Sequence, residues 1–378
     1  MNHNKKISIF LFTSMLHGGG AERVASTLSQ AFKSVDITLI LEEGVVSYPY
    51  KGRLIILHEK QPQNKSVMHL RSLWKLGKLM KDMKPDIVMC FLPIPSTIAV
   101  GAKVLFNYKG KLIMRVSDTF GEWIHRTRFG LWKKLILAIV YKFSPVIVAT
   151  SDGVRVDLMQ NFDVNEEKIK VIHNPFDIHH ICKLAEEEVE HPWFKDEIPI
   201  IISVGRLTEA KAPAHCIKAF SKVRRAVKCR LVIIGTGELR GSLEELCKHL
   251  ELKEDVVFLG WQDNPFKYVA RASVFVLSSL WEGFANVIVE AMALGIPVVS
   301  TDCPSGPREI ITDGLNGILV PVGNIDKMAE AIIKVLSNTE LALKLSNEGR
   351  KRAHYFHVEK IIREYEEMLV NVYSGRWT

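Results

Sequence analysis

The sequence lacks any long apolar run, and this absence limits where the protein resides. No window reaches the roughly 18–20 consecutive apolar residues that a membrane-spanning helix needs. The amino-terminal stretch MNHNKKISIFLF is basic and then apolar for only six residues, which is too short for a signal peptide. We therefore expect a cytoplasmic protein that is either soluble or peripheral on a membrane.

A metal-ligand pattern is also missing. The six cysteines are scattered without a CxxC pair, and a disulfide framework is typical of small secreted proteins rather than of a chain of 378 residues. We expect buried free thiols and no bound metal. The cysteines are Cys90, Cys182, Cys216, Cys229, Cys247 and Cys303.

Charge is unevenly distributed along the chain. Residues 1–175 contain 25 Lys and Arg against 14 Asp and Glu (net +11), whereas residues 176–378 contain 25 against 28 (net −3), which together give the total of +8. A basic half indicates an anionic partner such as lipid headgroups or phosphate groups, although solubilising lysines would give the same count. No recognised module or interleaved aromatic motif supports a nucleic-acid partner.

Two series of short apolar runs separated by helical patterns predict two domains with parallel sheets. The linker is placed at residues 174–197, because this segment holds two prolines and an acidic run. The predicted domains are 1–175 and 176–356, and the helix at about 357–378 is expected to pack back on the first. The predicted strands are 7–12, 37–41, 54–57, 86–92, 112–116 and 146–149 in the first series, and 198–204, 230–234, 256–259, 274–277 and 298–300 in the second.

Gly18, Gly19 and Gly20 connect the first strand to a helix. Glycines let a backbone approach a ligand closely, and a helix N-terminus presents unpaired N–H groups to an anion. The run does not match GxGxxG, which disfavours a dinucleotide site. A simple tight turn remains the alternative.

Two cations, Arg206 and Lys211, follow the first strand of the second series. Their spacing of five residues suits a diphosphate, because arginine binds phosphate bidentately and lysine adds a point charge. Ordinary surface cations are the alternative. The turn GTGE at 235–238 is interpreted as a simple strand-to-helix turn.

The most informative stretch runs from Glu282 to Glu290, two carboxylates eight residues apart after the strand at 274–277. The residues between them are expected to open a helix whose amides hold phosphate oxygens. Glu282 suits sugar hydroxyls and Glu290 the two hydroxyls of a ribose, whereas a capping residue and an exposed helical residue are the alternatives. The intervening candidates for ligand binding are Gly283, Phe284, Ala285, Asn286 and Val287.

The motifs GGGAERV, GRLTEAK, GTGEL and Glu-x7-Glu, in this order, resemble those of family-four retaining glycosyltransferases of the GT-B fold. The resemblance covers nearly the whole chain and is strongest over residues 200–320. It implies an α/β protein of two Rossmann-like parallel-sheet domains that face an interdomain cleft. The sequence looks most like bacterial enzymes that extend undecaprenyl-diphosphate-linked oligosaccharides, O-antigens or capsules, and among them it is similar to N-acetylgalactosaminyltransferases of bacterial N-glycan assembly.

The resemblance implies a role for each motif. Arg206 and Lys211 would neutralise the donor diphosphate, Glu282 would orient the donor sugar, and Glu290 would bind the ribose. The loop at 260–263, with Gln262, would meet the base, and Gly18–Gly20 would shape the floor of the cleft. The implied reaction transfers a hexose or N-acetylhexosamine from a UDP-sugar to a polyprenyl-diphosphate-linked glycan, with retention and without a metal or other cofactor. Two cations and a helix N-terminus can replace a divalent ion electrostatically.

One position departs from the family. Many relatives carry a histidine after the strand that corresponds to residues 112–116, whereas Ser117 stands here. Asp118, His125 or a backbone carbonyl could take over part of its role.

Residues 123–143 combine aromatic and aliphatic side chains with arginines and lysines. Such a segment can lie in a membrane interface, which would place the enzyme on anionic lipid at the cytoplasmic face of the inner membrane. An ordinary crossover helix is the alternative.

For the whole chain, the competing functions are a nucleotide-sugar epimerase and a nucleotide-binding protein without transferase activity.

Overall fold

The computed structural model describes residues 6–59, 64–121 and 130–377. The chain divides into two compact units, Met1–Pro175 together with Val358–Thr378, and Phe176–His357. They are called the first and the second domain below. Within the described ranges, none of the helices combines the length and apolarity needed to cross a membrane.

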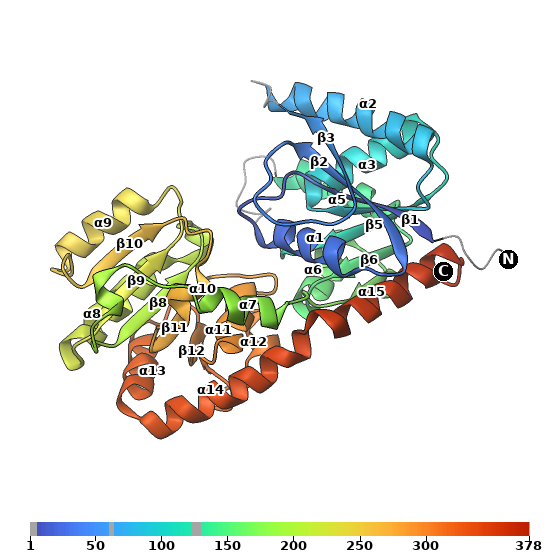
Figure 1. The fold of residues 1–378 in the computed structure, drawn as a ribbon. Coiled ribbons are helices and arrows are strands. Elements are labelled where there is room, and N and C mark those ends of the chain that lie inside the picture. The colour runs from blue at the N-terminus through green and yellow to red at the C-terminus, as the bar shows by residue number, and fades with distance from the viewer. Residues whose placement is uncertain (1–5, 60–63, 122–129, 378) are drawn as a thin grey trace. The chain divides into compact units, whose positions relative to one another are not determined.

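The first domain is built on a seven-stranded sheet in which every neighbouring pair is parallel (Figure 1). The strand order is β3-β2-β1-β4-β5-β6-β7. Most strands are apolar runs rich in Ile and Val, as expected where helices cover both faces of a sheet. The strands are β1 (Ile7–Thr13), β2 (Val35–Glu43), β3 (Arg53–His58), β4 (Ile87–Phe91), β5 (Lys111–Val116), β6 (Val146–Ala149) and β7 (Ile169–Val171).

Helices cover both faces of this sheet. Local capping fixes several of their starts: the side chain of Asn64 accepts from the amides of Ser66 and Val67, and Ser151 caps in the same way. One core cluster joins four of the helices to one sheet face, namely α2 (Lys65–Met83), α3 (Pro93–Leu105), α5 (Gly130–Lys142) and α6 (Asp152–Phe162). A second cluster joins α1 (Gly20–Ala31) and α15 (Val358–Tyr373) to the other face.

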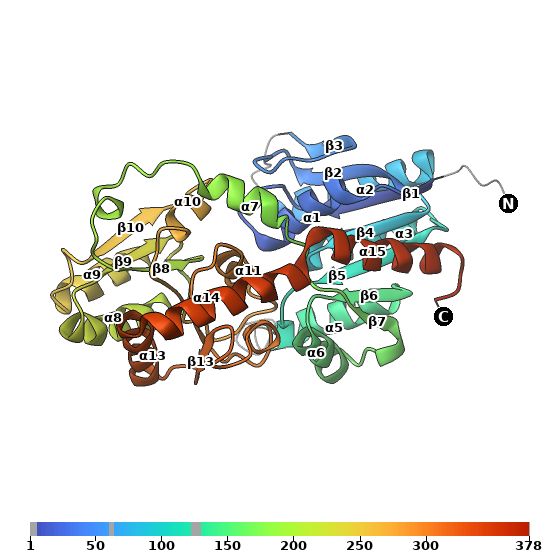
Figure 2. The same cartoon turned by 60° about the horizontal axis from the view of Figure 1, so that its bottom comes forward.

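The last helix belongs to the first domain. Ile361, Tyr365 and Leu369 recur every four residues on one side of α15, and all three are buried. They share a core cluster with Val24 and Leu28 of α1, and Figure 2 shows α15 running along the sheet. The chain therefore returns to the first domain after completing the second.

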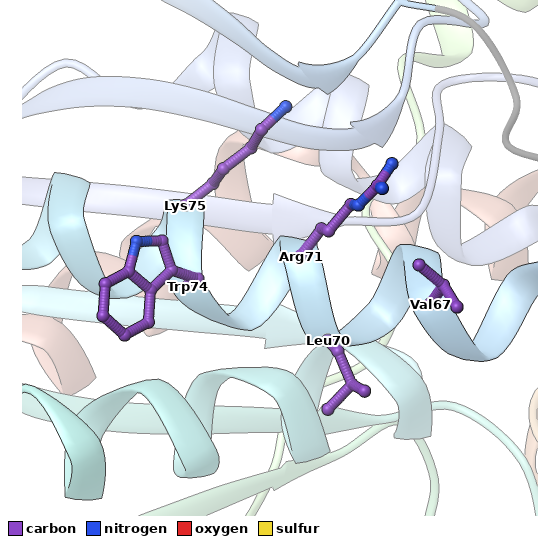
Figure 3. A pocket seen from close by; sticks show the side chains of 5 residues that line it. All are labelled: Val67, Leu70, Arg71, Trp74 and Lys75. Carbon is purple, nitrogen blue, oxygen red and sulfur yellow. The ribbon is translucent and has the colours of Figure 1, made fainter.

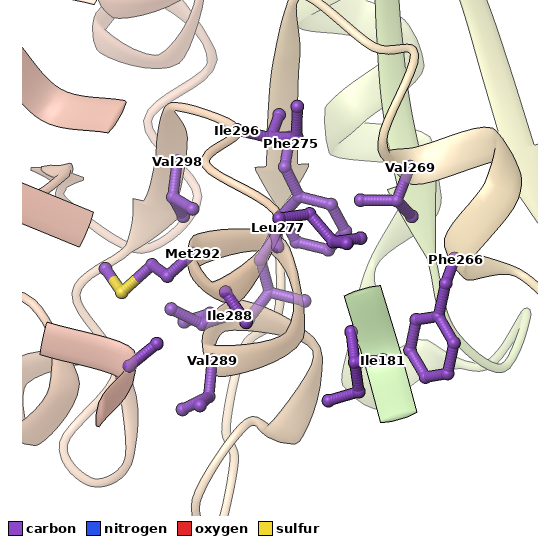
Figure 4. Packing of buried hydrophobic residues seen from close by; sticks show 14 of the residues in the cluster. Ile181, Phe266, Val269, Phe275, Leu277, Ile288, Val289, Met292, Ile296 and Val298 are labelled. Atoms are coloured by element: carbon purple, nitrogen blue, oxygen red, sulfur yellow. The ribbon is translucent and has the colours of Figure 1, made fainter. Parts of the chain in front are cut away.

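The second domain contains a six-stranded parallel sheet of order β10-β9-β8-β11-β12-β13. One face packs on α8 (Pro213–Ala226), α9 (Arg240–His249) and α13 (Ile325–Ser337). The other packs on α7 (Ile178–Ala185), α10 (Phe266–Val269), α11 (Asn286–Ala293) and α12 (Pro307–Ile310) (Figure 4). Helix α14 (Thr339–Ala353) precedes α15. The strands are β8 (Ile200–Val204), β9 (Arg230–Ile234), β10 (Val256–Gly260), β11 (Val274–Leu277), β12 (Val298–Thr301) and β13 (Ile318–Val320).

The predicted fold class of two Rossmann-like parallel-sheet domains is confirmed, but one interpretation of the sequence was wrong. Residues 174–197 are not a plain linker, because they contain α7. Asp177 caps this helix by accepting from the amide of His180, and Ile178 and Ile181 are buried in the second core. The short strands β7 and β13 were also missed, since three-residue strands carry too few side chains for a periodic signal.

Both strand orders reverse at one point. In the first sheet the reversal lies between β1 and β4, and in the second it lies between β8 and β11. The loops that leave the carboxyl ends of two such strands diverge to opposite faces of the sheet, and ligands of open α/β sheets bind in the crevice between them. In the second domain these loops carry Lys211 and Glu282.

Candidate active site

Lys211 and Glu282 meet at the reversal point of the second sheet. Lys211 lies in the loop after β8 and Glu282 in the loop after β11, and Nζ of the lysine is 2.5 Å from Oε1 of the glutamate. The lysine side chain is 23% exposed and the glutamate side chain 6%. A cation and a carboxylate 71 residues apart are thus held together at the edge where this fold class binds ligands.

Glu282 has a second partner that the sequence analysis did not single out. The hydroxyl of Ser279, which is fully buried, donates to the same Oε1 over 2.6 Å. No described residue donates to Oε2, so this oxygen can accept a hydrogen bond from a ligand hydroxyl. The only sequence feature that could have pointed to Ser279 as a partner of Glu282 is its place in the pair of serines directly after β11.

The two loops are also joined through their backbones. The hydroxyl of Ser278 donates to the carbonyls of Lys211 and Ala212, each over 3.0 Å. The amide of Leu280 donates to the carbonyl of Ala210 over 2.8 Å. The spacing between the lysine and the glutamate is therefore set by the main chain as well as by their ion pair.

A tight turn holds the loop after β8 from its other side. The amide of Gly205 donates to the carbonyl of Ile234, and the amide of Gly235 donates to the carbonyl of Gly260. Gly235 has φ +136°, and a Cβ there would lie 1.9 Å from the carbonyl oxygen of Gly205. Only glycine fits this close approach. The close approach of Gly235 to the carbonyl of Gly205 agrees with the interpretation of residues 235–238 as a structural turn.

The segment from Gly283 to Ala285 is a turn, and α11 begins only at Asn286. Ala285 occupies the N-cap position with φ +62° and contributes no side-chain hydrogen bond to the helix. Ser305, from the loop after β12, supports the turn: its hydroxyl donates to the carbonyl of Glu282 and, over 3.3 Å, to that of Gly283. Ser305 is 2% exposed, and no sequence spacing had indicated it.

The other predicted residues of the second domain lie in the loop after β8, in the loop after β10, in the turn before α11 and in α11 itself. Arg206 is exposed and has no ion-pair partner within the described part of the chain. Gln262 follows β10, where its amide donates to the carbonyl of Leu259 and its oxygen accepts from the hydroxyl of Tyr268. Phe284 is buried in the core cluster, and Glu290 is 6% exposed in the second turn of α11. Their contacts with a ligand stay predictions.

Gly18 and Gly19 lie in the turn between β1 and α1, and Gly20 is the first residue of α1. Gly18 has φ +76°, and Gly19 occupies the N-cap position of α1. A Cβ on Gly19 would collide with the carboxylate of Glu22, which bends back over the start of the helix. His17 next to the turn is hydrogen-bonded to Ser47 through Nδ1 over 2.9 Å.

The position that departs from the family follows β5. Ser117 and Asp118 are both half-buried, and the carboxylate of Asp118 accepts from the amide of Thr119 over 2.9 Å. His125 lies outside the described residues. Two residues before Ser117, Arg115 is 1% exposed. It donates from Nε to the hydroxyl of Tyr365 on α15 and from Nη2 to Asn174. This arginine ties α15 to the sheet.

One thiol borders the pair formed by Lys211 and Glu282. Cys303 is fully buried, and its Sγ donates to the carbonyl of Ser279 over 3.2 Å. Burial raises the pKa of the Cys303 thiol to about 12, which keeps it neutral and unreactive near pH 7. The chemistry of this edge thus rests on a cation, a carboxylate and hydroxyl groups.

Two family models match consecutive parts of the chain. Residues 18–180 match the model "Glycosyltransferase Family 4", and residues 185–352 match the model "Glycosyl transferases group 1". The second match contains both Lys211 and Glu282.

Named relatives span almost the entire chain. N-acetylgalactosamine-N,N'-diacetylbacillosaminyl-diphospho-undecaprenol 4-alpha-N-acetylgalactosaminyltransferase of Campylobacter jejuni is 32% identical and covers 95% of this chain and 98% of its own. The lipopolysaccharide core biosynthesis glycosyltransferase LpsE of Rhizobium meliloti is 28% identical over 93% of this chain and 96% of its own.

Solved structures show the same fold. HepE of Anabaena, crystallised with UDP-glucose, superposes with a TM-score of 0.81 at 19% identity, covering 96% of this chain and 99% of its own. An identity this low supports only the fold, whereas the relatives and the family models carry the assignment of family and activity. The chain belongs to the family-four glycosyltransferases of the GT-B fold.

Proposed function

We propose that this glycosyltransferase transfers a hexose or N-acetylhexosamine from a UDP-sugar to a polyprenyl-diphosphate-linked glycan during assembly of a bacterial surface polysaccharide or glycoprotein glycan. The reaction retains the anomeric configuration and needs no metal. The enzyme works in the cytoplasm, at the inner face of the inner membrane.

The observation that carries this proposal is the arrangement of Lys211 and Glu282 at the reversal point of the second sheet. The lysine can neutralise a phosphate oxygen of the donor, and Arg206 in the same loop adds a second cation that is exposed and available. Glu282 is held by its bond from Ser279 and can accept from sugar hydroxyls through Oε2. Both charges are fixed before substrate arrives, which favours stabilisation of a developing diphosphate leaving group.

One relative and one protein of the same fold support the choice of substrates. The Campylobacter jejuni relative acts, by its name, on a glycan linked to diphospho-undecaprenol, and HepE binds UDP-glucose with the same fold. Because the chain covers nearly the full length of both proteins, the comparison concerns the whole architecture. The predicted cleft between the domains and the roles of Gly18–Gly20, Gln262 and Glu290 stay predictions.

The first test measures nucleoside diphosphate release from a panel of UDP-, GDP- and ADP-sugars, with and without polyprenyl-linked glycans extracted from membranes. We expect release from a UDP-sugar only when the lipid-linked acceptor is present. Release that does not need the acceptor would contradict the proposal, as would strict preference for a GDP- or ADP-sugar.

The mechanism is tested on the product and with a chelator. Proton NMR of the glycan formed from an α-linked donor should show an α-anomeric signal, and a β signal would contradict retention. EDTA should leave the initial rate within about twofold of its value without chelator, because Arg206 and Lys211 supply the charge that a divalent ion would otherwise provide. A loss that added Mg²⁺ or Mn²⁺ restores would contradict metal independence.

A further inference from the structure

Large apolar side chains are exposed mainly on three helices of the first domain. Of the 22 large hydrophobic side chains that the described residues expose, 11 are on α2, α3 and α5. We call the outward surface of these helices the outer helical face. Its exposed apolar side chains are Val67, Leu70, Trp74, Ile94, Val104, Leu105, Leu131, Trp132, Leu135, Ile136 and Ile139.

The three helices form one continuous layer. Their inward side chains share a single core cluster on the same face of the sheet, and α3 contacts both α2 and α5. Figure 1 shows α2 and α3 side by side. The exposed apolar residues therefore belong to one surface and not to three unrelated spots.

The outer helical face carries charge of almost one sign. The three helices contain nine lysines and arginines, and Asp82 is their single acidic residue. Two of the nine, Lys75 and Lys103, donate from Nζ to backbone carbonyls of neighbouring segments. The second domain, whose sequence has a net negative charge, has its exposed large apolar side chains at scattered places such as Trp261, Leu343 and Tyr355. A large patch that is both apolar and basic marks an interaction site for an anionic partner.

Helix α2 shows how the two kinds of side chain alternate. Leu70 and Trp74, which are 70% and 60% exposed, share its outer surface with Arg71, Lys75 and Val67. Together these five residues line a shallow depression of about 320 Å³ (Figure 3). An aromatic ring and aliphatic side chains beside long cationic side chains suit the boundary between lipid headgroups and acyl chains, where lysine and arginine extend toward phosphate.

Helix α5 repeats this pattern on the same layer. Leu131 and Trp132 are 83% and 68% exposed, and Lys133, Lys134 and Lys142 come from the same helix. Of the predicted membrane segment at 123–143, residues 123–129 lie outside the described part of the chain. Residues 130–142 form α5, whose inner side packs in the core as expected of a crossover helix. Its outer side presents the exposed apolar and basic side chains that the membrane interpretation requires.

We propose that the outer helical face docks the first domain on the surface of an anionic lipid bilayer. Its apolar side chains enter the headgroup region, and its lysines and arginines pair with lipid phosphates. The membrane surface thus extends beyond the segment at 123–143 to α2 and α3. This surface is independent of Lys211 and Glu282, so the inference stands or falls separately from the proposed donor and acceptor.

Vesicle flotation of the full chain tests the inference. We expect binding to vesicles that contain about one third phosphatidylglycerol, none to pure phosphatidylcholine, and a steep decrease as salt rises from about 0.1 to 0.5 M. Two triple variants separate the contributions. One is Lys78→Gln, Lys81→Gln and Lys142→Gln, for which we expect a partition constant lower by roughly 100-fold, about fivefold for each lysine. The other is Leu70→Ser, Leu131→Ser and Trp132→Ser, for which we expect at least a tenfold loss.

Matched controls come from exposed positions of the second domain. They are Lys248→Gln, Lys327→Gln and Lys351→Gln for charge, and Leu315→Ser, Leu343→Ser and Tyr355→Ser for apolar area. Circular dichroism confirms that each variant is folded, and the controls should bind vesicles like the parent protein. The inference would be overturned if the controls lost binding equally, or if the parent protein did not bind anionic vesicles. It would also be overturned if the parent protein sedimented as a dimer that the apolar variant dissociates while its vesicle binding stays unchanged.

Discussion

The two domains share a parallel sheet whose strand order reverses once, yet they present different chemistry. In the second domain the reversal point carries a cation and a carboxylate that are mutually bonded and largely buried. In the first domain Arg115, near the carboxyl end of β5, is enclosed by Tyr365 and Asn174, and lysines and arginines are exposed on the outer helical face. The same scaffold therefore supports a reactive edge in one domain and a basic apolar surface in the other.

The difference follows from where each domain places its charges. Reaction chemistry needs charges that are pre-positioned and partly desolvated, because electrostatic interactions are strongest away from water. Attachment to a lipid surface needs charges that are solvated and movable, because they must reach many headgroups at little cost. Buried charges in both domains would leave nothing to attract a membrane, and exposed charges in both would leave no organised site.

The largest expected effect tests the second domain. Replacing Glu282 by Gln removes the negative partner of Lys211 and the charged acceptor of Ser279, and we expect kcat to fall by about 10²–10³-fold. The matched control is Glu330→Gln, an exposed glutamate of α13, which should retain full activity. Initial rates of acceptor-dependent nucleoside diphosphate release measure both variants.

The same variant tests whether the two domains act independently. Glu282→Gln should float with anionic vesicles as the parent protein does, because the outer helical face is unchanged. Full activity in a folded Glu282→Gln protein would remove the assigned role of the carboxylate. Loss of vesicle binding in that variant would contradict the separation of functions between the two domains.

The next effect compares one arginine from each domain. Replacing Arg115 by Met removes the buried hydrogen bonds that this arginine donates to Tyr365 and Asn174, and we expect the free energy of unfolding of the first domain to fall by roughly 1.5–3 kcal/mol. Arg240→Met in the second domain removes an exposed pair with Glu244 and a long, exposed hydrogen bond to the carbonyl of Phe258, which together should cost less than about 1 kcal/mol. Denaturant unfolding of the two variants measures the difference, and equal effects would show that the enclosed arginine does not anchor α15.

The smallest effect concerns the support of the active-site turn. Ser305→Ala removes the hydroxyl that bonds the carbonyls of Glu282 and Gly283, and we expect a loss of about 1 kcal/mol in stability and a several-fold decrease in kcat. Ser221→Ala on α8, whose exposed hydroxyl bonds only within its own helix, serves as the control. If both serine variants keep full activity, the turn is positioned without Ser305.

Much of the fold could be predicted because it rests on local patterns. Strands such as β1 and β4 are continuous apolar runs, and α15 has its apolar residues at helical spacing. Helix α7 was missed because its eight residues lie beside prolines and acidic residues, so composition suggested a linker while Ile178 and Ile181 were needed in the core. Tertiary burial decided that segment.

The candidate site was predictable only in part. Arg206, Lys211 and Glu282 could be selected from charge and from their position after apolar runs, and the resemblance gave them roles. Ser305 could not be selected, because a serine that bonds a carbonyl 23 residues earlier leaves no periodic trace. The same holds for Arg115, whose sequence neighbours gave no sign that it would be enclosed by a tyrosine 250 residues later.

The sequence by itself determined that two parallel α/β domains form, that the first half is basic, and which charged residues follow the strands, because apolar periodicity and charge are properties of the chain. The tertiary structure alone decided that Lys211 pairs with Glu282, that Ser279 and Ser305 support this pair, and that the apolar residues of α2, α3 and α5 share one exposed layer. The physical reason is that these contacts join residues distant in sequence. Only the order of strands in the folded sheet brings such residues to one edge or one face.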